Sequence, residues 1–135
     1  MKPRPEEVPG SPRDWLAHAK SDLSLARLAK DDTRILPEQI CFHAQQAAEK
    51  ALKAVLLFKR IEFPLVHDIE ELLELMKQGG IQLPREVGEA GILTPYAVEA
   101  RYPGQPEEIT AADVTEAIAV AEAVVRWAAG MIEIS

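Results

Sequence analysis

Five polar side chains recur at helical spacing in the middle of the chain. They are Gln39, His43, Gln46, Lys50 and Lys53, separated by four, three, four and three positions, so on a helix they share one face. The set contains no carboxylate, although the whole chain carries 22 Asp and Glu against 15 Lys and Arg. Amides, an imidazole and two ammonium groups can donate hydrogen bonds to a phosphate or a carboxylate. The alternative is a polar face that only meets solvent, as on most amphipathic helices.

Two other places carry groups of the same kind. His67 precedes Asp68, which is placed to cap a helix, and helix N-termini favour anions. The alternative for His67 is packing against the following turn. Arg101 stands between Tyr96 and Tyr102, an arrangement that suits stacking and contact with a base or a phosphate, or an ion pair with a neighbouring helix. The residues alone leave both alternatives open.

Other common site chemistries are missing from the sequence. The three histidines, His18, His43 and His67, fall on three predicted segments without the spacing of metal ligands. The one cysteine, Cys41, rules out an intramolecular disulfide and a zinc site built on several thiolates. No glycine-rich phosphate loop occurs. We therefore expect no metal and no cofactor.

The composition favours a small helical domain. The chain has 135 residues, of which 47% are hydrophobic, enough for one core and too many for a disordered chain. Aromatic residues make up only 5%, and the composition favours helix over sheet. A net charge of −7 argues against a charge-driven nucleic-acid coat protein. No membrane span or signal peptide is indicated, so we expect a cytoplasmic protein.

Prolines, glycines and capping residues divide the chain. Residues 1–10 are expected to form a flexible arm and residues 11–135 a single domain. The first helix is predicted from a Ser11–Asp14 capping box, with Pro12 at the first position, to about Lys30, and the second from Pro37 to about Lys59. The third is predicted from Asp68, with Glu71 as reciprocal cap, to Gly79 and Gly80, and the fourth from Pro84 to Tyr102 with a kink or break at Pro95. The last is predicted to begin at Thr110, with Asp113 at its third position. These segments predict an all-α protein, an antiparallel four-helix bundle with an additional short or kinked helix.

Two apolar surfaces predict a homodimer. Residues 54–58 are apolar almost all round, and the last helix offers Val124, Val125, Ile132 and Ile134 over a wide arc. We expect one small bundle to have difficulty covering both surfaces. An uncovered apolar patch tends to pair, and a two-fold axis is the commonest solution.

Four blocks of the sequence together resemble the HEPN family. They are W-L-x-x-A-x-x-D-L-x-x-A from Trp15 to Ala26, F-H-A-Q-Q-A-A-E-K-A-L-K-A from Phe42 to Ala54, H-D-I-x-x-L from His67, and L-x-x-Y-x-x-x-A-R-Y-P over residues 93–103. The resemblance covers about residues 13–130. It implies a four- or five-helix bundle that commonly dimerises. It also implies a genomic partnership with a small nucleotidyltransferase, often in a toxin–antitoxin or similar two-gene system.

The resemblance implies two classes of function. Some family members are thought to bind nucleotides or to act as non-catalytic partners, and others are metal-independent ribonucleases. The ribonuclease branch has an Arg and a later His with four to six residues between them. Arg101 is the matching Arg here, but no His follows it, and the pairs Arg13–His18 and Arg60–His67 that match the spacing lie on other segments.

We therefore expect binding rather than catalysis: a nucleotide- or RNA-binding dimeric partner of a nucleotidyltransferase. The alternative is a ribonuclease toxin that uses Arg101, and a third possibility is a bundle that only assembles. The predicted ligand site consists of His43, Gln46, Lys50, Lys53, His67, Tyr96, Arg101 and Tyr102. In a groove, Lys50 and Arg101 would create positive potential on an otherwise acidic protein.

Overall fold

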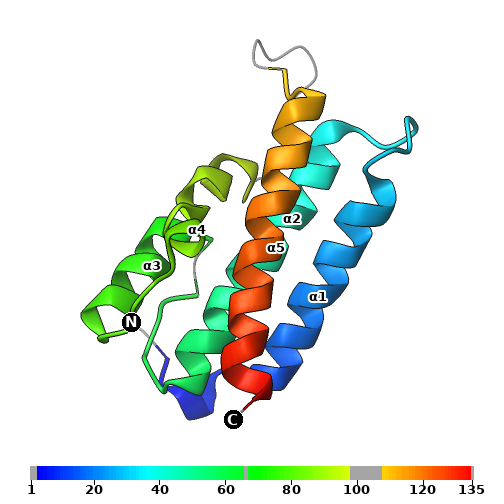
Figure 1. Cartoon of the computed structure of the whole chain (residues 1–135). Coiled ribbons are helices and arrows are strands. Elements are labelled where there is room, and N and C mark those ends of the chain that lie inside the picture. Colours follow the sequence, from blue (N-terminus) through cyan, green and yellow to red (C-terminus); the bar gives the residue numbers. More distant parts are fainter. Residues whose placement is uncertain (1–2, 66, 98–107, 135) are drawn as a thin grey trace.

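The protein is a bundle of three long helices with shorter helical elements along one flank (Figure 1). The computed structural model describes residues 3–65, 67–97 and 108–134. The long helices are α1 (Pro12–Ala29), α2 (Pro37–Phe58) and α5 (Ala111–Glu133), and the flank holds α3 (Ile69–Gln78), α4 (Arg85–Gly88) and the 3₁₀ segment η2 (Ala90–Ala97). A short 3₁₀ turn, η1 (Pro5–Glu7), precedes α1. The described residues contain no strand, and the predicted all-helical bundle is confirmed.

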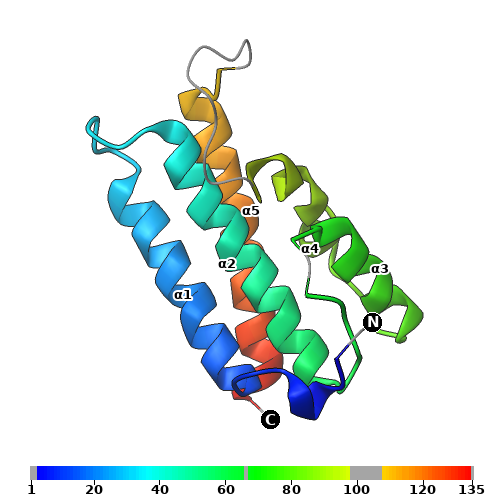
Figure 2. The same ribbon diagram turned by 180° about the vertical axis from the view of Figure 1, so that it is seen from behind.

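Helix α2 is the central element of the bundle. It contacts α1, α5, α3 and η2, and Figure 2 shows it in front of α5 with α1 on one side and α3 on the other. Alanines recur on its contact faces, and Ala44, Ala47, Ala48, Ala51 and Ala54 are all completely buried. The distance between packed helices depends on the side chains at the contact, so these small residues allow several neighbours to approach α2 closely.

Helix α1 runs antiparallel to both other long helices, whereas α2 and α5 run in the same direction (Figures 1 and 2). Two exposed ion pairs connect α1 to α5. Lys20 Nζ lies 2.9 Å from Glu133 Oε1, and Arg27 Nε lies 3.0 Å from Glu122 Oε1. The parallel arrangement of α2 and α5 follows because the chain between them returns to the end of the bundle where α2 begins.

Two of the long helices begin at the capping boxes predicted from the sequence. At α1, Asp14 N donates to Ser11 Oγ at 3.1 Å, and Ser11 N donates to Asp14 Oδ2 at 2.8 Å. At α5, Thr110 and Asp113 make the same pair of bonds. These reciprocal bonds satisfy backbone N–H groups that a helix start otherwise leaves unpaired.

The start of α3 differs from its prediction. Asp68 is the N-cap, as expected, but its side chain accepts a hydrogen bond from Glu70 N at 3.0 Å. The predicted reciprocal bond from Glu71 is wrong, because the Asp68 carboxylate turns toward the second helical N–H instead of the third. The helix ends before Gly79 and Gly80, as predicted.

The fourth predicted helix is divided, but not at its proline. Helix α4 ends at Gly88, and η2 begins at Ala90 and contains Pro95. Glycines at positions 88 and 91 weaken an α-helix at this point, and Pro95 lacks the N–H that an α-helical continuation would use. The predicted end of this segment, from Tyr102 to Gly104, lies outside the described residues.

The single chain buries most of the apolar surfaces on which the homodimer prediction was based, although Ile134 is 84% exposed. Val55, Val124, Val125 and Ile132 are all buried, because α2 occupies the centre of the bundle and α5 packs against it. The expectation that a single bundle leaves these surfaces uncovered is therefore wrong for the buried residues and holds for Ile134, and the homodimer itself stays a prediction. The exposed large hydrophobic side chains of the described residues are Leu25, Leu28, Leu36, Leu65, Ile92 and Ile134. None of the described helices has the length and hydropathy that crossing a bilayer requires.

The segment before α1 lies against one end of the bundle. Val8 is buried and belongs to the core, and Trp15 Nε1 donates a hydrogen bond to Pro9 O at 2.8 Å. Gly10 has a φ of +86°, a left-handed conformation that favours glycine and turns the chain into α1. We call residues 5–10 the strap. The predicted flexibility of residues 1–10 stays a prediction.

Replacing Leu52 by Ala should lower the free energy of unfolding by about 2–5 kcal/mol, because the change leaves a cavity at the centre of α2. Leu52 is 0% exposed. The matched control is Leu28→Ala, at a position that is 82% exposed; it should change the value by less than about 0.5 kcal/mol. Urea unfolding followed by circular dichroism measures both variants, and equal effects would contradict the central position of α2.

Candidate ligand-binding site

One carboxylate of α1 contacts an ammonium and an imidazole of α2. Lys50 Nζ donates to Asp22 Oδ2 at 2.7 Å, and His43 Nδ1 lies 3.1 Å from Asp22 Oδ1. The side chains of His43 and Lys50 are 27% and 26% exposed. We call these three residues the Asp22 network. It reaches solvent between the two helices, and because an ammonium has three N–H donors, Lys50 can bind Asp22 and a ligand together.

A second network lies deeper along α2. Glu49 accepts hydrogen bonds from Lys53 Nζ and from Gln45 Nε2, each at 3.0 Å. His67 Nδ1 lies 3.0 Å from Glu49 Oε1, and Gln46 Nε2 donates to Gln45 Oε1 at 2.8 Å. We call these five residues the Glu49 network. It leads from the half-buried Gln46 inward to the buried Lys53.

Glu49 and Lys53 form a buried ion pair. Their side chains are 3% and 5% exposed. Removing two charges from water costs several kcal/mol per ion, and the pair persists only where other hydrogen bonds satisfy the remaining groups. Gln45 and His67 supply such bonds to Glu49, and the Lys53 ammonium lies 5.9 Å from the centre of the Trp15 ring, within cation–π distance.

The predicted stripe on α2 is thus divided into an outer and an inner part. His43, Gln46 and Lys50 are half-buried and border the surface between α1 and α2. Lys53 turns inward to Glu49 and Trp15, so it belongs to the packed interior and not to an open groove. His67 lies one residue before the cap of α3 and is 68% exposed at its side chain while holding Glu49.

Of the other predicted site residues, the structure describes only Tyr96, which lies on the flank that holds η2. Tyr96 is half-buried in η2 and packs against the core. Arg101 and Tyr102 lie outside the described residues, so their approach to α2 stays a prediction.

Sequence reasoning missed the acidic and amide partners of these cations. Asp22 was not predicted because it lies on α1, and the spacing of residues along α2 contains no information about side chains of another helix. Gln45 and Glu49 were overlooked because they lie on a face that is otherwise alanine. The available signal was the spacing of Gln45, Glu49 and Lys53 at four-residue steps, which places the three side chains along one line of α2.

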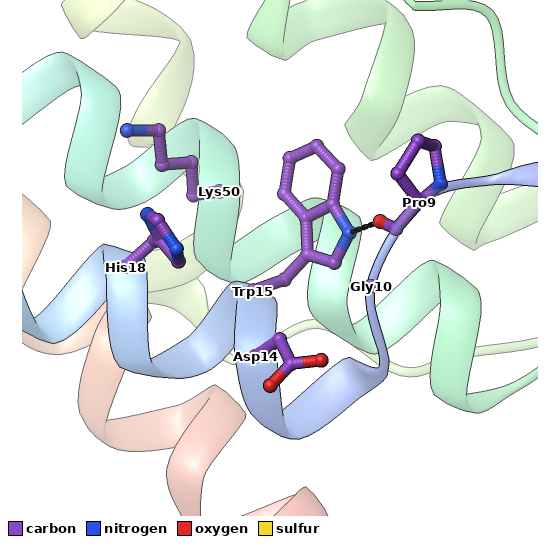
Figure 3. A pocket seen from close by; sticks show the side chains of 6 residues that line it. All are labelled: Pro9, Gly10, Asp14, Trp15, His18 and Lys50. Carbon is purple, nitrogen blue, oxygen red and sulfur yellow. Dashed lines mark hydrogen bonds between the residues drawn. The ribbon is translucent and has the colours of Figure 1, made fainter.

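A pocket of about 440 Å³ lies beside the Asp22 network (Figure 3). It is lined by Pro9, Gly10, Asp14, Trp15, His18 and Lys50. Figure 3 shows His18 and Lys50 on one side of the Trp15 indole and Pro9 of the strap on the other. Lys50 therefore belongs both to the Asp22 network and to the pocket wall. No sequence pattern indicated a ligand at Trp15 or His18.

Asp14 stays ionised at the edge of this pocket. The backbone N–H of Ser11, and then the Ser11 side chain, hold the pKa of the Asp14 carboxyl below its ordinary value. The nearby His18 adds a smaller effect in the same direction. The pocket thus has a negative group at the capping box and the Lys50 ammonium toward α2. Among the described residues, no three His, Cys, Asp or Glu side chains are grouped to bind a metal.

The fold and the two α2 networks define a small all-helical domain with a polar seam between its first two long helices. The HEPN domain model matches residues 12–132, and the chain belongs to this family. The archaeal HEPN homologue ST0689 is similar in structure, with 31% sequence identity and a TM-score of 0.73 over 91% of this chain and 98% of that chain.

A second solved structure supports the same conclusion. TT1696 from Thermus thermophilus is 30% identical, with a TM-score of 0.72 over 87% of this chain and 94% of that chain. No curated protein is significantly similar to the chain.

Replacing Glu49 by Leu should destabilise the protein by about 3–5 kcal/mol, because Lys53 then stays buried without its counter-charge. The double variant Glu49→Leu/Lys53→Met should recover most of that loss. The matched control is Glu89→Leu, which breaks the exposed pair with Arg85 at the same four-residue spacing; we expect a change below about 1 kcal/mol. Chemical unfolding measures all three variants, and a double variant no more stable than Glu49→Leu would contradict the charge argument.

Proposed function

We propose that this HEPN protein binds a nucleotide or an RNA end and acts in the cytoplasm as the dimeric partner of a small nucleotidyltransferase, in a two-gene system of the toxin–antitoxin kind. The observation that carries the proposal is the Asp22 network. It presents the half-buried Lys50 ammonium at a surface pocket, with the half-buried His43 imidazole on the same carboxylate, on a protein whose net charge is −7.

The donors of the Asp22 network can bind an anion, because in this structure Lys50 and His43 already contact the Asp22 carboxylate. The Asp22 carboxylate accepts from Lys50 and faces His43 Nδ1. Phosphate oxygens accept hydrogen bonds from the same donors, and charge-assisted bonds of this type are about twice as strong as neutral ones. Asp22 positions the two side chains in the absence of ligand and also reduces their positive potential.

The proposed protein partners rest on the family and on exposed apolar surface. Leu28 and Leu36 lie exposed at the end of α1 and just before α2, and Leu25 lies one turn earlier on α1. Apolar side chains gathered at one end of a bundle are typical of surfaces that contact another chain. They support association with a second copy or with a nucleotidyltransferase.

A ribonuclease is the second candidate, and one observation favours it. The Asp22 carboxylate contacts His43 Nδ1 and so orients the ring, as carboxylates orient a histidine that acts as general base. In this alternative His43 would act with Arg101 on the 2′-hydroxyl of RNA without a metal.

Replacing Lys50 by Ala should weaken ATP binding by about 10-fold or more, the value of one charge-assisted hydrogen bond. Asp22→Asn should strengthen binding, because it removes the carboxylate that competes with the phosphate. Lys77→Ala, which removes an exposed ammonium from α3, is the charge-matched control and should leave the affinity unchanged. Isothermal titration calorimetry measures each variant.

The same preparations distinguish the two candidates. A short RNA is incubated with the protein in the presence of a chelator. Cleavage that disappears in both His43→Ala and Arg101→Ala would select the ribonuclease. Absence of binding to ATP and to RNA would contradict the proposal.

We also expect the protein to be a dimer in solution at micromolar concentration. Light scattering should give twice the mass of one chain. A mass equal to one chain at that concentration would exclude the dimer and leave the exposed leucines for a different partner.

A further inference from the structure

We propose that the pocket at Trp15 is a mononucleotide subsite, in which the base stacks on the indole and the phosphate lies between His18 and Lys50. This inference rests on the proposed function and deepens it, because it places the base at residues outside the polar stripe of α2. Trp15, His18 and the strap form the new part of the site.

The indole of Trp15 is held in a fixed position. Its Nε1 donates to Pro9 O at 2.8 Å, and the buried Lys53 ammonium lies 5.9 Å from the ring centre. Gly10 completes this support, since a Cβ at that position would lie 3.4 Å from Trp15 Nε1 and the φ of +86° is strained for other residues. A rigid aromatic face loses little conformational freedom when a base stacks on it, which favours stacking.

The charges around the pocket orient the ligand. The ionised Asp14 lies at the capping box and repels a phosphate, whereas Lys50 lies toward α2 (Figure 3). His18 stands between them, one helical turn from Asp14 on α1. The phosphate is therefore placed on the side of His18 and Lys50. There it shares the Lys50 ammonium with the Asp22 carboxylate, which lies 2.7 Å from Lys50 Nζ.

The dimensions and the lining of the pocket agree with this ligand. A volume of about 440 Å³ lies within the range of roughly 300–1,000 Å³ typical of small-molecule sites. The walls combine an indole and a proline with a few polar groups, Asp14 on one side and His18 and Lys50 on the other, and such sites use a few polar groups to fix the direction of a bound ring. A phosphate without a base would leave the indole face unused.

The test uses the emission of Trp15 in full-length protein. The other tryptophan, Trp127, lies on α5 outside this pocket, so a Trp127→Phe background isolates the signal. AMP, UMP, adenosine and ribose 5-phosphate are titrated by fluorescence and, in parallel, by calorimetry. We expect AMP to quench the emission with the calorimetric dissociation constant, adenosine to bind at least ~10-fold more weakly, and ribose 5-phosphate to leave the emission unchanged.

Three variants of the site residues and one control variant separate the contributions of the indole and the imidazole. Trp15→Ala should weaken AMP and adenosine alike by about 10-fold, with Trp15→Phe retaining part of the affinity and guarding against loss of folding. His18→Ala should weaken AMP but not adenosine. Lys20→Ala, which removes a cation of α1 that pairs with Glu133, should change neither.

Two outcomes would overturn the inference in distinguishable ways. Calorimetric binding of AMP without a change in Trp15 emission would place the ligand elsewhere and leave the proposed function standing. No binding of AMP, UMP or short RNA by calorimetry would overturn the proposed function together with the subsite.

Discussion

The ion pair between Glu49 and Lys53 is the interaction on which the arrangement of the molecule depends. A helix at the centre of a bundle has little surface left for solvent, so polar groups on the buried faces of α2 must find partners inside the protein. Glu49 does so through hydrogen bonds with Lys53, Gln45 and His67. The contact with Lys53 positions its ammonium near the Trp15 ring. The contact with His67 connects the chain before α3 to the middle of α2.

The parts of the fold that could be predicted are those determined by local chemistry. Ser11 with Asp14, and Thr110 with Asp113, are three residues apart and satisfy each other at helix starts, so their sequence pattern is nearly sufficient. The long apolar stripes of α1, α2 and α5 were equally readable because burial repeats with the helical period. The position of the break at Glu89 was harder to predict, because the nearby glycines and Pro95 are each able to end an α-helix.

The site was less predictable because its contacts join different segments. A helical stripe shows which side chains share a face, but not whether that face meets water or another helix. For His43 and Lys50 the stripe was a useful guide, whereas Lys53, on the same predicted face, turned into the interior. The partner Asp22 comes from another helix, and Trp15 gains its position from a backbone carbonyl of the strap. Such contacts follow from tertiary packing and leave no periodic trace.

The strap also bears on how this protein can diverge from its relatives. The family match begins at Pro12, whereas Pro9 and Gly10, which form one wall of the pocket, precede it. The bundle and its buried ion pair belong to the shared domain, but that wall is supplied by a segment outside it. Changes at Pro9 and Gly10 can therefore alter this wall of the pocket, whereas Val8 in the same segment is part of the core. Relatives with the same helices and different leading segments are expected to differ in the shape of this pocket.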